Sequence, residues 1–235
     1  MANNFFTFKQ FTVNQGKSAF KVGTDGVLLG ACADVSGAGK ILDIGTGTGL
    51  IALMIAQRCN AQITAIEPDH ESFTECCENI NRSPWKDRVT AIESTLQDFR
   101  SDVKYDLIVT NPPYFSGSLV STDPRKSSAR HDITLSSSDI LRSLNELLSE
   151  DGHLQLILPY AEGNIFIAEA AEHGYYCQDI LKIRPLPTSE IRRLILRFGR
   201  KRIRPAEKFL TIEYGRRQEF SEEYKRLTGD FYLKF

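Results

Sequence analysis

The turn that joins an early predicted strand to the helix after it constrains this fold more than any other feature. In "LDIGTGTGL" it links an apolar run, residues 40–44, to a run with helical spacing, residues 50–59. Gly45, Gly47 and Gly49 permit a tight turn and let a ligand approach the backbone beside the free N–H groups of the helix. The G-x-G-x-G spacing differs from the dinucleotide fingerprint, and no Gly-Lys-Ser/Thr follows, so a phosphate-binding P-loop is excluded.

Apolar runs of strand length alternate with runs of helical spacing along most of the chain. This alternation predicts a parallel sheet with helices on both faces, an α/β fold. The predicted strands are 40–44, 63–66, 88–92, 105–110 and 153–159, and the predicted helices are 50–59, 69–80, 139–148 and 165–173. Two later strands, 178–183 and 194–198, have only a loop between them and predict an antiparallel hairpin at the sheet edge. We expect a turn at Asp151-Gly152.

The chain has 235 residues, 41% hydrophobic and 25% charged, which fits one globular domain. We expect a single domain, 1–235, made of an N-terminal hairpin and short helix capped by Thr24 (1–39), a catalytic core (40–204) and a C-terminal extension (205–235). The five cysteines and four histidines show no metal-ligand spacing, which predicts free thiols and no metal site. No apolar run is long enough for a membrane helix or signal region, so we expect a cytoplasmic protein.

Three carboxylates lie near the ends of the first three predicted strands of the sheet. Asp43, just before the glycine turn, would repel a phosphate and favour a cation such as an amino group. Glu67 can accept hydrogen bonds from both hydroxyls of a ribose, and Asp98 can accept one from the exocyclic amine of adenine. An amine, a ribose and an adenine together describe S-adenosylmethionine. A plain tight turn, and a solvated loop acid at Asp98, remain the alternatives.

These motifs in this order resemble the class I S-adenosylmethionine-dependent methyltransferases. The stretch "TNPPYF" after the strand 105–110 carries Asn-Pro-Pro-Tyr, the amino-group methyltransferase signature of that superfamily. The resemblance implies a Rossmann-like α/β fold with a seven-stranded, mostly parallel sheet whose last strand is antiparallel. S-adenosyl-L-methionine is the implied cofactor.

The two prolines of the Asn-Pro-Pro-Tyr stretch form a stiff tip that no helix or sheet ladder can continue. The side-chain oxygen of Asn111 and the carbonyl of Pro112 can accept the two hydrogens of a planar amine, which leaves its lone pair free to attack a methyl group. Tyr114 offers a flat face for stacking. Transfer would then depend on positioning more than on a strong base. Adenine, cytosine and a glutamine side chain all fit this arrangement.

Further blocks resemble one branch of the superfamily, the bacterial valine-tRNA adenine-N6 methyltransferases. They are "FKQFTVNQGKSAFKVGTDGVLLGAC", the "ARHD" after the tip and the closing "EYKRLTGDFYLKF". The resemblance implies methylation of adenosine-37, beside the anticodon. It also places Thr24 and Asp25 near the methionine end of the cofactor, and we count Asn111 among the cofactor-binding residues as well.

Basic residues concentrate in one window although the net charge is −1. Nine basic residues and one acid, Glu190, lie between Lys182 and Arg204. Such a cluster predicts phosphate contacts, and a polar segment without periodicity, residues 116–134, adds further cations. The predicted RNA-binding residues are Arg125, Lys126, Arg130, Arg197, Arg200, Lys201 and Arg202. A solvated basic edge is the alternative.

Other functions share part of these features. A release-factor glutamine methyltransferase has the same tip, but it usually carries an N-terminal helical domain for which the residues before Lys40 leave no room. A ribosomal-RNA or DNA adenine methyltransferase would use the same chemistry. A cofactor-binding regulator on this fold would not need an intact Asn-Pro-Pro-Tyr tip.

Overall fold

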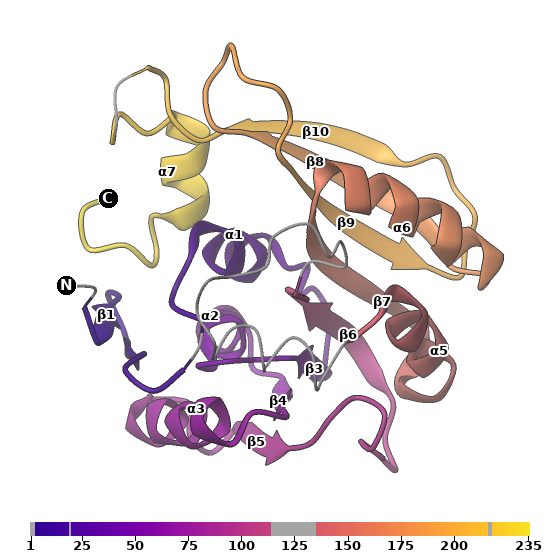
Figure 1. Ribbon diagram of the computed structural model, residues 1–235, viewed down its shortest axis with the longest axis horizontal. Coiled ribbons are helices and arrows are strands. Elements are labelled where there is room, and N and C mark those ends of the chain that lie inside the picture. Colours follow the sequence, from indigo (N-terminus) through magenta and orange to yellow (C-terminus); the bar gives the residue numbers. More distant parts are fainter. Residues whose placement is uncertain (1–2, 19, 114–134, 216–217) are drawn as a thin grey trace, which may run out of the picture.

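The computed structural model describes residues 3–18, 20–113, 135–215 and 218–235. Its centre is an eight-stranded sheet of order β10-β8-β9-β7-β6-β3-β4-β5 (Figure 1). All neighbouring strands are parallel except β9, which is antiparallel to both β7 and β8. The strands are β3 (Lys40–Ile44), β4 (Gln62–Glu67), β5 (Val89–Glu93), β6 (Tyr105–Thr110), β7 (Leu148–Pro159), β8 (Tyr176–Arg184), β9 (Arg193–Gly199) and β10 (Ala206–Thr211).

The predicted α/β class is confirmed, with three differences in the sheet. The antiparallel strand β9 lies inside the sheet, between β7 and β8, and not at its edge. An eighth strand that we did not predict, β10, pairs in parallel with β8 and forms the edge, where four of its six residues are exposed and leave no clear alternation. The expected turn at Asp151-Gly152 is instead part of β7. The pairing of β7 with β6 shifts its register at this point.

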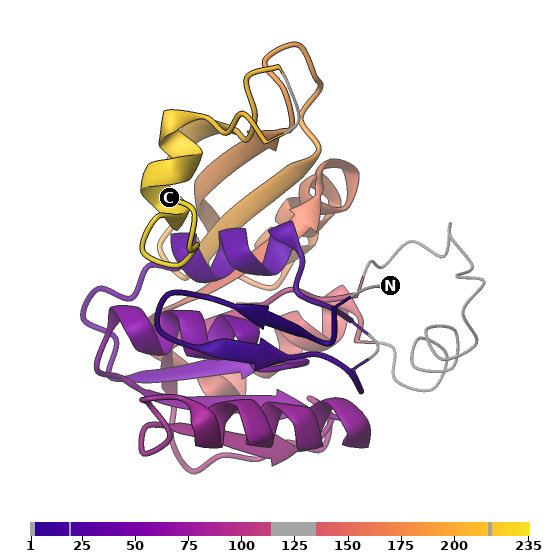
Figure 2. The same cartoon turned by 90° about the vertical axis from the view of Figure 1, so that its left-hand side faces the viewer.

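Helices cover both faces of this sheet, as expected (Figures 1 and 2). On one side lie α1 (Thr24–Cys32), α2 (Leu50–Arg58), α3 (His70–Arg82) and α7 (Glu222–Thr228), and on the other lie α5 (Ser137–Leu147) and α6 (Tyr160–Glu172). Successive strand residues alternate between two cores. Ile41 and Leu107 pack with α1 and α2, whereas Leu42 and Ile108 pack with α5 and α6. Strands buried on both faces explain the continuous apolar runs of the sequence.

The predicted N-terminal hairpin is present as β1 (Phe5–Thr7) and β2 (Thr12–Asn14). It packs on the C-terminal end of the chain (Figure 2). The ring of Phe8 lies 5.9 Å from that of Tyr232, and Lys9 Nζ donates to the carbonyl oxygens of Gly229 (2.6 Å) and Phe235 (2.7 Å). The closing block of the sequence therefore holds the hairpin in place.

Helix α1 begins differently from the prediction. Its N-cap is Gly23, without a side-chain capping bond, and Thr24 is the first helical residue. The prediction that Thr24 caps the helix is therefore wrong. Because the Thr24 hydroxyl is not used for capping, its exposed side chain can line the neighbouring cavity.

Candidate functional site

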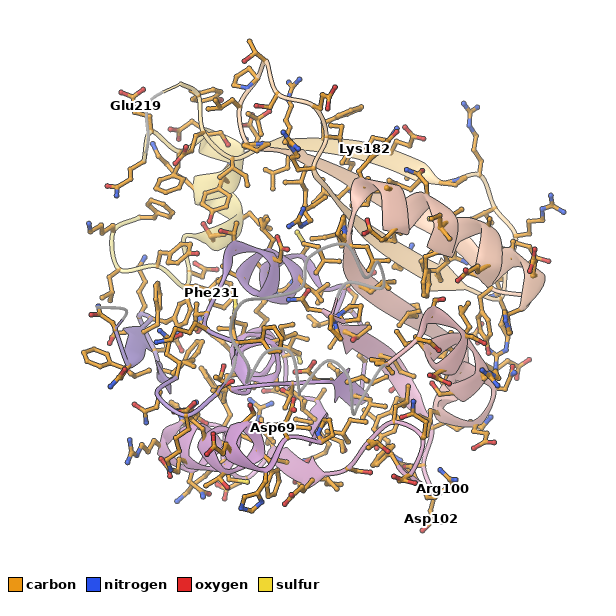
Figure 3. The ribbon with its side chains drawn as sticks, in the orientation of Figure 1. Asp69, Arg100, Asp102, Lys182, Glu219 and Phe231 are labelled. Carbon is orange, nitrogen blue, oxygen red and sulfur yellow. The ribbon has the colours of Figure 1, made fainter. Side chains whose placement is uncertain are left out.

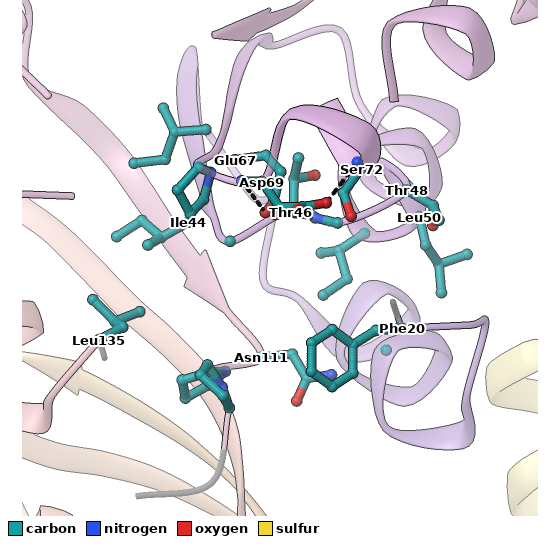
Figure 4. Close-up of a pocket in the computed structure, with 18 of the residues that line it drawn as sticks. Phe20, Ile44, Thr46, Thr48, Leu50, Glu67, Asp69, Ser72, Asn111 and Leu135 are labelled. Atoms are coloured by element: carbon teal, nitrogen blue, oxygen red, sulfur yellow. Dashed lines mark hydrogen bonds between the residues drawn. The ribbon is translucent and has the colours of Figure 1, made fainter. Parts of the chain in front are cut away.

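A cavity of about 510 Å³ opens at the carboxyl ends of β3, β4 and β6 (Figure 4). The chain runs from β3 to β4 and β5 on one side and then returns to β6 on the other, so this is the switch point at which ligands bind in open α/β sheets. The glycine turn, the end of β4, the start of α3, the loop after β5, the tip after β6 and residues 20–26 all contribute to the lining.

The glycine turn forms the floor of this cavity. Gly45, Gly47 and Gly49 have φ angles of 68°, 57° and 83°, in the left-handed region that favours glycine. The backbone N–H of Gly45 donates to the carbonyl of Ile66 at 2.9 Å, which fixes the turn to the end of β4. A Cβ on Gly49 would stand 2.9 Å from the Cys76 sulfur, so α3 also packs closely against the turn. The predicted tight turn is present in full.

Glu67 lies at the cavity wall and is 8% exposed. Its carboxylate accepts hydrogen bonds from the backbone N–H of Gly47 (2.8 Å) and of Asp69 (3.0 Å). Burial raises the pKa of Glu67, and the two N–H donors oppose that rise. A carboxylate held in this way keeps acceptor capacity for a ligand hydroxyl.

Asp69 is a further acid of the wall to which the sequence analysis gave no site role. It caps α3, because its side chain accepts from the backbone N–H of Ser72 at 2.8 Å. Both Asp69 and Ser72 line the cavity, on the same side as Glu67 (Figure 4). The signal was present in "EPD", where a second acid follows the strand-end acid at the start of a helix.

Asp43 lies beneath the glycine turn, is fully buried, and does not line the cavity with the residues described. Its Oδ2 accepts from the hydroxyl of Thr46 (2.5 Å) and from the backbone N–H of Ala52 (3.2 Å). Its Oδ1 has no hydrogen-bond partner among the described residues. Burial raises the pKa of Asp43 to about 7, and the nearby Glu67 charge acts in the same direction. Thr46, held by Asp43, is the residue that faces the cavity.

Asp98 lies outside the described lining as well. Its side chain is exposed and accepts from the Thr95 hydroxyl at 2.7 Å, within one turn of the loop after β5. The loop residues that line the cavity are Ser94, Thr95, Leu96 and Gln97. In this structure the Asp98 side chain points toward Thr95 and not into the cavity, so its predicted contact with an adenine amine is not preformed.

The tip after β6 reaches the cavity with Asn111, Pro112 and Pro113. The hydroxyl of Thr110 donates to the carbonyl of Ile44 at 2.9 Å, which ties the end of β6 to the end of β3. Asn111 lies across the cavity from Glu67, Asp69 and Ser72 (Figure 4). Tyr114 lies outside the described residues.

Residues 24–26 form another wall of the cavity, which includes Thr24 and Asp25. Asp25 Oδ2 accepts from Arg193 Nε at 2.8 Å, and both side chains are less than one third exposed. Arg193, which the sequence analysis counted with the basic window, thus supports the cavity wall from the first residue of β9.

The basic window is spread along the length of β9 and is not gathered at the cavity. Arg193 lies at the cavity end of β9, and Arg200 follows seven residues later, roughly 23 Å away along an extended strand. Arg197 pairs with Asp179 and, at 3.9 Å, with Asp34. Lys201 pairs with Asp151 at 2.9 Å.

Arg200, Arg202 and Lys182 also lie away from the cavity, whereas Arg184 and Arg192 lie at the cavity end of the sheet. The guanidinium groups of Arg200 and Arg202 lie over the rings of Tyr175 (5.0 Å) and Tyr176 (5.6 Å). Lys182 lies on the β8 side of the sheet, remote from Asp69 (Figure 3). The predicted RNA-binding residues Arg125, Lys126 and Arg130 lie outside the described residues.

Two other kinds of site are absent from the described part of the chain. No group of three or more His, Cys, Asp or Glu side chains there is arranged to hold a metal ion. None of its helices has the length and apolar character needed to cross a bilayer.

Comparison with known proteins places this geometry in a class. Residues 17–159 match the model of the methyltransferase small domain family. A predicted O-methyltransferase from Agrobacterium tumefaciens superposes with a TM-score of 0.65 at 18% identity, covering 88% of this chain and 96% of that one. The glycopeptide N-methyltransferase MtfA, in its complex with S-adenosylmethionine, superposes with a TM-score of 0.54 at 14% identity, covering 77% of this chain and 100% of that one. The family model identifies the chain as a methyltransferase, and its fold is the one that these methyltransferases share.

A full-length relative makes the assignment more specific. A protein of Parabacteroides distasonis named tRNA1(Val) (adenine(37)-N6)-methyltransferase is 42% identical over 100% of both chains. The chain belongs to the family of that relative, within the methyltransferase small domain proteins.

Proposed function

We propose that this protein transfers a methyl group from S-adenosylmethionine to N6 of adenosine-37 in valine tRNA, and that residues 1–235 act as one methyltransferase domain. The observation that carries the proposal is one cavity that joins the glycine turn and Glu67 on one side to the Asn111-Pro112 tip on the other. The name of the full-length relative supports the choice of substrate.

The residues of the cavity fit this cofactor. A volume of about 510 Å³ suits a ligand of its size. Glu67 would accept from the ribose hydroxyls, and the left-handed glycine turn lets the backbone approach the ligand closely. Thr24 and Asp25 would face the methionine end. When bound, the cofactor supplies the methyl group as a sulfonium.

The tip supplies the acceptors for the substrate amine. The Asn111 side-chain oxygen and the Pro112 carbonyl would accept the two amine hydrogens, which favours a nitrogen whose lone pair is free. Proline fixes its own φ angle and restricts the residue before it, so these acceptors are preorganised. Preorganised acceptors stabilise the charge that develops on the amine during transfer. The target base would have to leave its stack to reach them.

The direct test is methyl transfer from labelled cofactor to a valine-tRNA transcript. We expect incorporation into the wild-type transcript and none when guanosine replaces adenosine-37. Parallel reactions with ribosomal RNA and with release factor examine the two alternative acceptors. Equal labelling of the guanosine transcript would refute the site, and labelling of release factor alone would refute the substrate class.

We expect Glu67→Gln to weaken binding of S-adenosylmethionine. Losing a charge-assisted hydrogen bond costs roughly 1.5–3 kcal/mol, about 10- to 150-fold in Kd. Glutamine is isosteric and can still accept from one of the two backbone N–H groups that Glu67 holds, so the fold should persist. Isothermal titration calorimetry measures the effect. Glu172→Gln is the matched control, because Glu172 is exposed at the end of α6, outside the described lining, and the Kd of this variant should equal that of the wild type. A Kd unchanged in Glu67→Gln would contradict the ribose contact.

We expect basic residues at the cavity end of the fold and basic residues at the opposite end to differ in their effect on tRNA binding. Lys21, Arg184 and Arg192 lie at the cavity end of the fold, whereas Lys201, Arg202 and Arg204 follow β9 at the opposite end. Binding is measured as the slope of log K against the logarithm of the salt concentration. Alanine at the first three should make this slope shallower by up to about 0.7–0.9 for each phosphate contact that is lost. Alanine at the second three should change it less. A larger loss from the second set would instead support the original RNA-binding assignment of Lys201 and Arg202.

A further inference from the structure

The segment before α1 is held along the cavity by polar side chains of α3. Glu75, which is 3% exposed, accepts from the backbone N–H groups of Gly16 (2.7 Å), Lys17 (3.1 Å) and Ser18 (2.9 Å). Asn79, which is 1% exposed, accepts from the N–H of Asn14. Its Nδ2 donates both to the carbonyl of Asn14 and to that of Thr48 in the glycine turn, each at 2.9 Å. The segment is thus tied to the floor of the cavity.

Hydrogen bonds also fix the backbone on both sides of Phe20. Ser18 Oγ accepts from Ser72 Oγ at 3.1 Å and donates to the Phe20 carbonyl at 3.1 Å. The N–H of Val22 donates to Gln15 Oε1 at 2.7 Å. The buried side chains of Glu75 and Asn79 therefore fix the backbone of this segment. The ring of Phe20 in the same segment is nevertheless 47% exposed.

The exposed ring of Phe20 faces the cavity on the side of the tip. Phe20 and Asn111 both line the cavity, and both lie across it from Glu67, Asp69 and Ser72 (Figure 4). A large apolar ring kept accessible to solvent gains free energy when a ligand covers it. The ligand that approaches Asn111 is the methyl acceptor, so a planar acceptor would cover this ring.

We propose that Phe20 is a stacking platform for the methyl-accepting base. The inference rests on the function proposed above and specifies its acceptor, since a heteroaromatic base can stack on this ring whereas a glutamine amide offers far less surface. Aromatic stacking is tolerant of base identity, so Phe20 selects bases as a class and the tip selects the amine. The α3 side chains Glu75 and Asn79 act as positioning residues for it.

The test compares Phe20→Ala, Phe20→Leu and Phe20→Trp. We expect Phe20→Ala to raise the KM for the valine-tRNA transcript roughly 5- to 150-fold, the range for loss of one stacked base. Phe20→Trp should keep most of the affinity, and Phe20→Leu, which keeps apolar bulk without a ring, should resemble Phe20→Ala. The Kd for S-adenosylmethionine should not change. The matched control is Phe209→Ala, since Phe209 is 62% exposed and lies on β10, outside the described lining of the cavity.

A binding readout separates this inference from the proposed function. A transcript with 2-aminopurine at position 37 should be less fluorescent when bound to the wild type than when bound to Phe20→Ala, because a base stacked on the Phe20 ring is quenched. A wild-type KM in Phe20→Ala, or wild-type behaviour of Phe20→Leu, overturns the stacking role. A raised Kd for the cofactor assigns Phe20 to the cofactor instead and also overturns it. If the wild type methylates no tRNA, the proposed function itself fails.

Discussion

Asn111→Ala is expected to lower the rate of methyl transfer by about 10²–10³-fold, the usual loss when one preorganised partner of a developing charge is removed. The side chain lines the cavity at the end of β6, whose position is fixed by the bond from Thr110 to Ile44. Its oxygen matters most as the amine becomes pyramidal, so the loss should fall on turnover and leave cofactor affinity nearly unchanged.

Single-turnover methylation of the valine-tRNA transcript measures this loss without interference from product release. Asn111→Asp is the matched variant, because it keeps an acceptor oxygen at the same position and should lose less activity than Asn111→Ala. Transfer by Asn111→Ala at nearly the wild-type rate would refute the proposed mechanism.

Asp43 is expected to make the protein less stable as the pH rises from about 4 to about 7. Its pKa is raised by burial from 3.8 to about 7 in the folded state, so across this window the native state holds a proton that the unfolded state has released. Stability is then highest below the unfolded pKa and is lost as the pH rises through the folded one. The whole effect is about 4 kcal/mol, at 1.36 kcal/mol per pKa unit.

Asp43→Asn removes this titration. Asparagine has the same shape and can still accept from Thr46 and Ala52 through one oxygen. Urea unfolding of both proteins between pH 4.5 and pH 8 gives the difference in their free energies of unfolding, in which the other titrating groups largely cancel. We expect the free energy of unfolding of Asp43→Asn to increase relative to that of the wild type as the pH rises. A difference that stays constant across the range would show that Asp43 is charged throughout.

Much of the fold could be predicted because its local signals agree with its tertiary environment. The strands buried on both faces, such as residues 40–44 and 105–110, appear as apolar runs, and the glycine turn has the residues that its left-handed φ angles require. The edge strand β10 could not be predicted in the same way, because its exposed residues are not under the constraint of a core. The position of β9 inside the sheet depends on pairing with two strands at once, which no local pattern encodes.

The chemistry at the ends of the strands could be predicted from residue types and their spacing alone. The residues that meet at one cavity lie at or just after the ends of parallel strands: Gly45, Gly47, Glu67, Asn111 and Pro112. Their residue types were readable because each performs a task that few side chains can perform.

Which polar side chains face the cavity could be seen only in the tertiary structure. In the fold, Asp43 lies beneath the glycine turn and Asp98 points toward Thr95. Asp69 lies in the cavity wall instead. The tertiary structure also divided the basic window between two ends of β9 and aligned Phe20 through Glu75, a residue more than fifty positions away in the chain. The physical reason is that side-chain direction in loops and contacts between distant segments depend on hydrogen bonds made across the fold, whereas strand and turn signals are local.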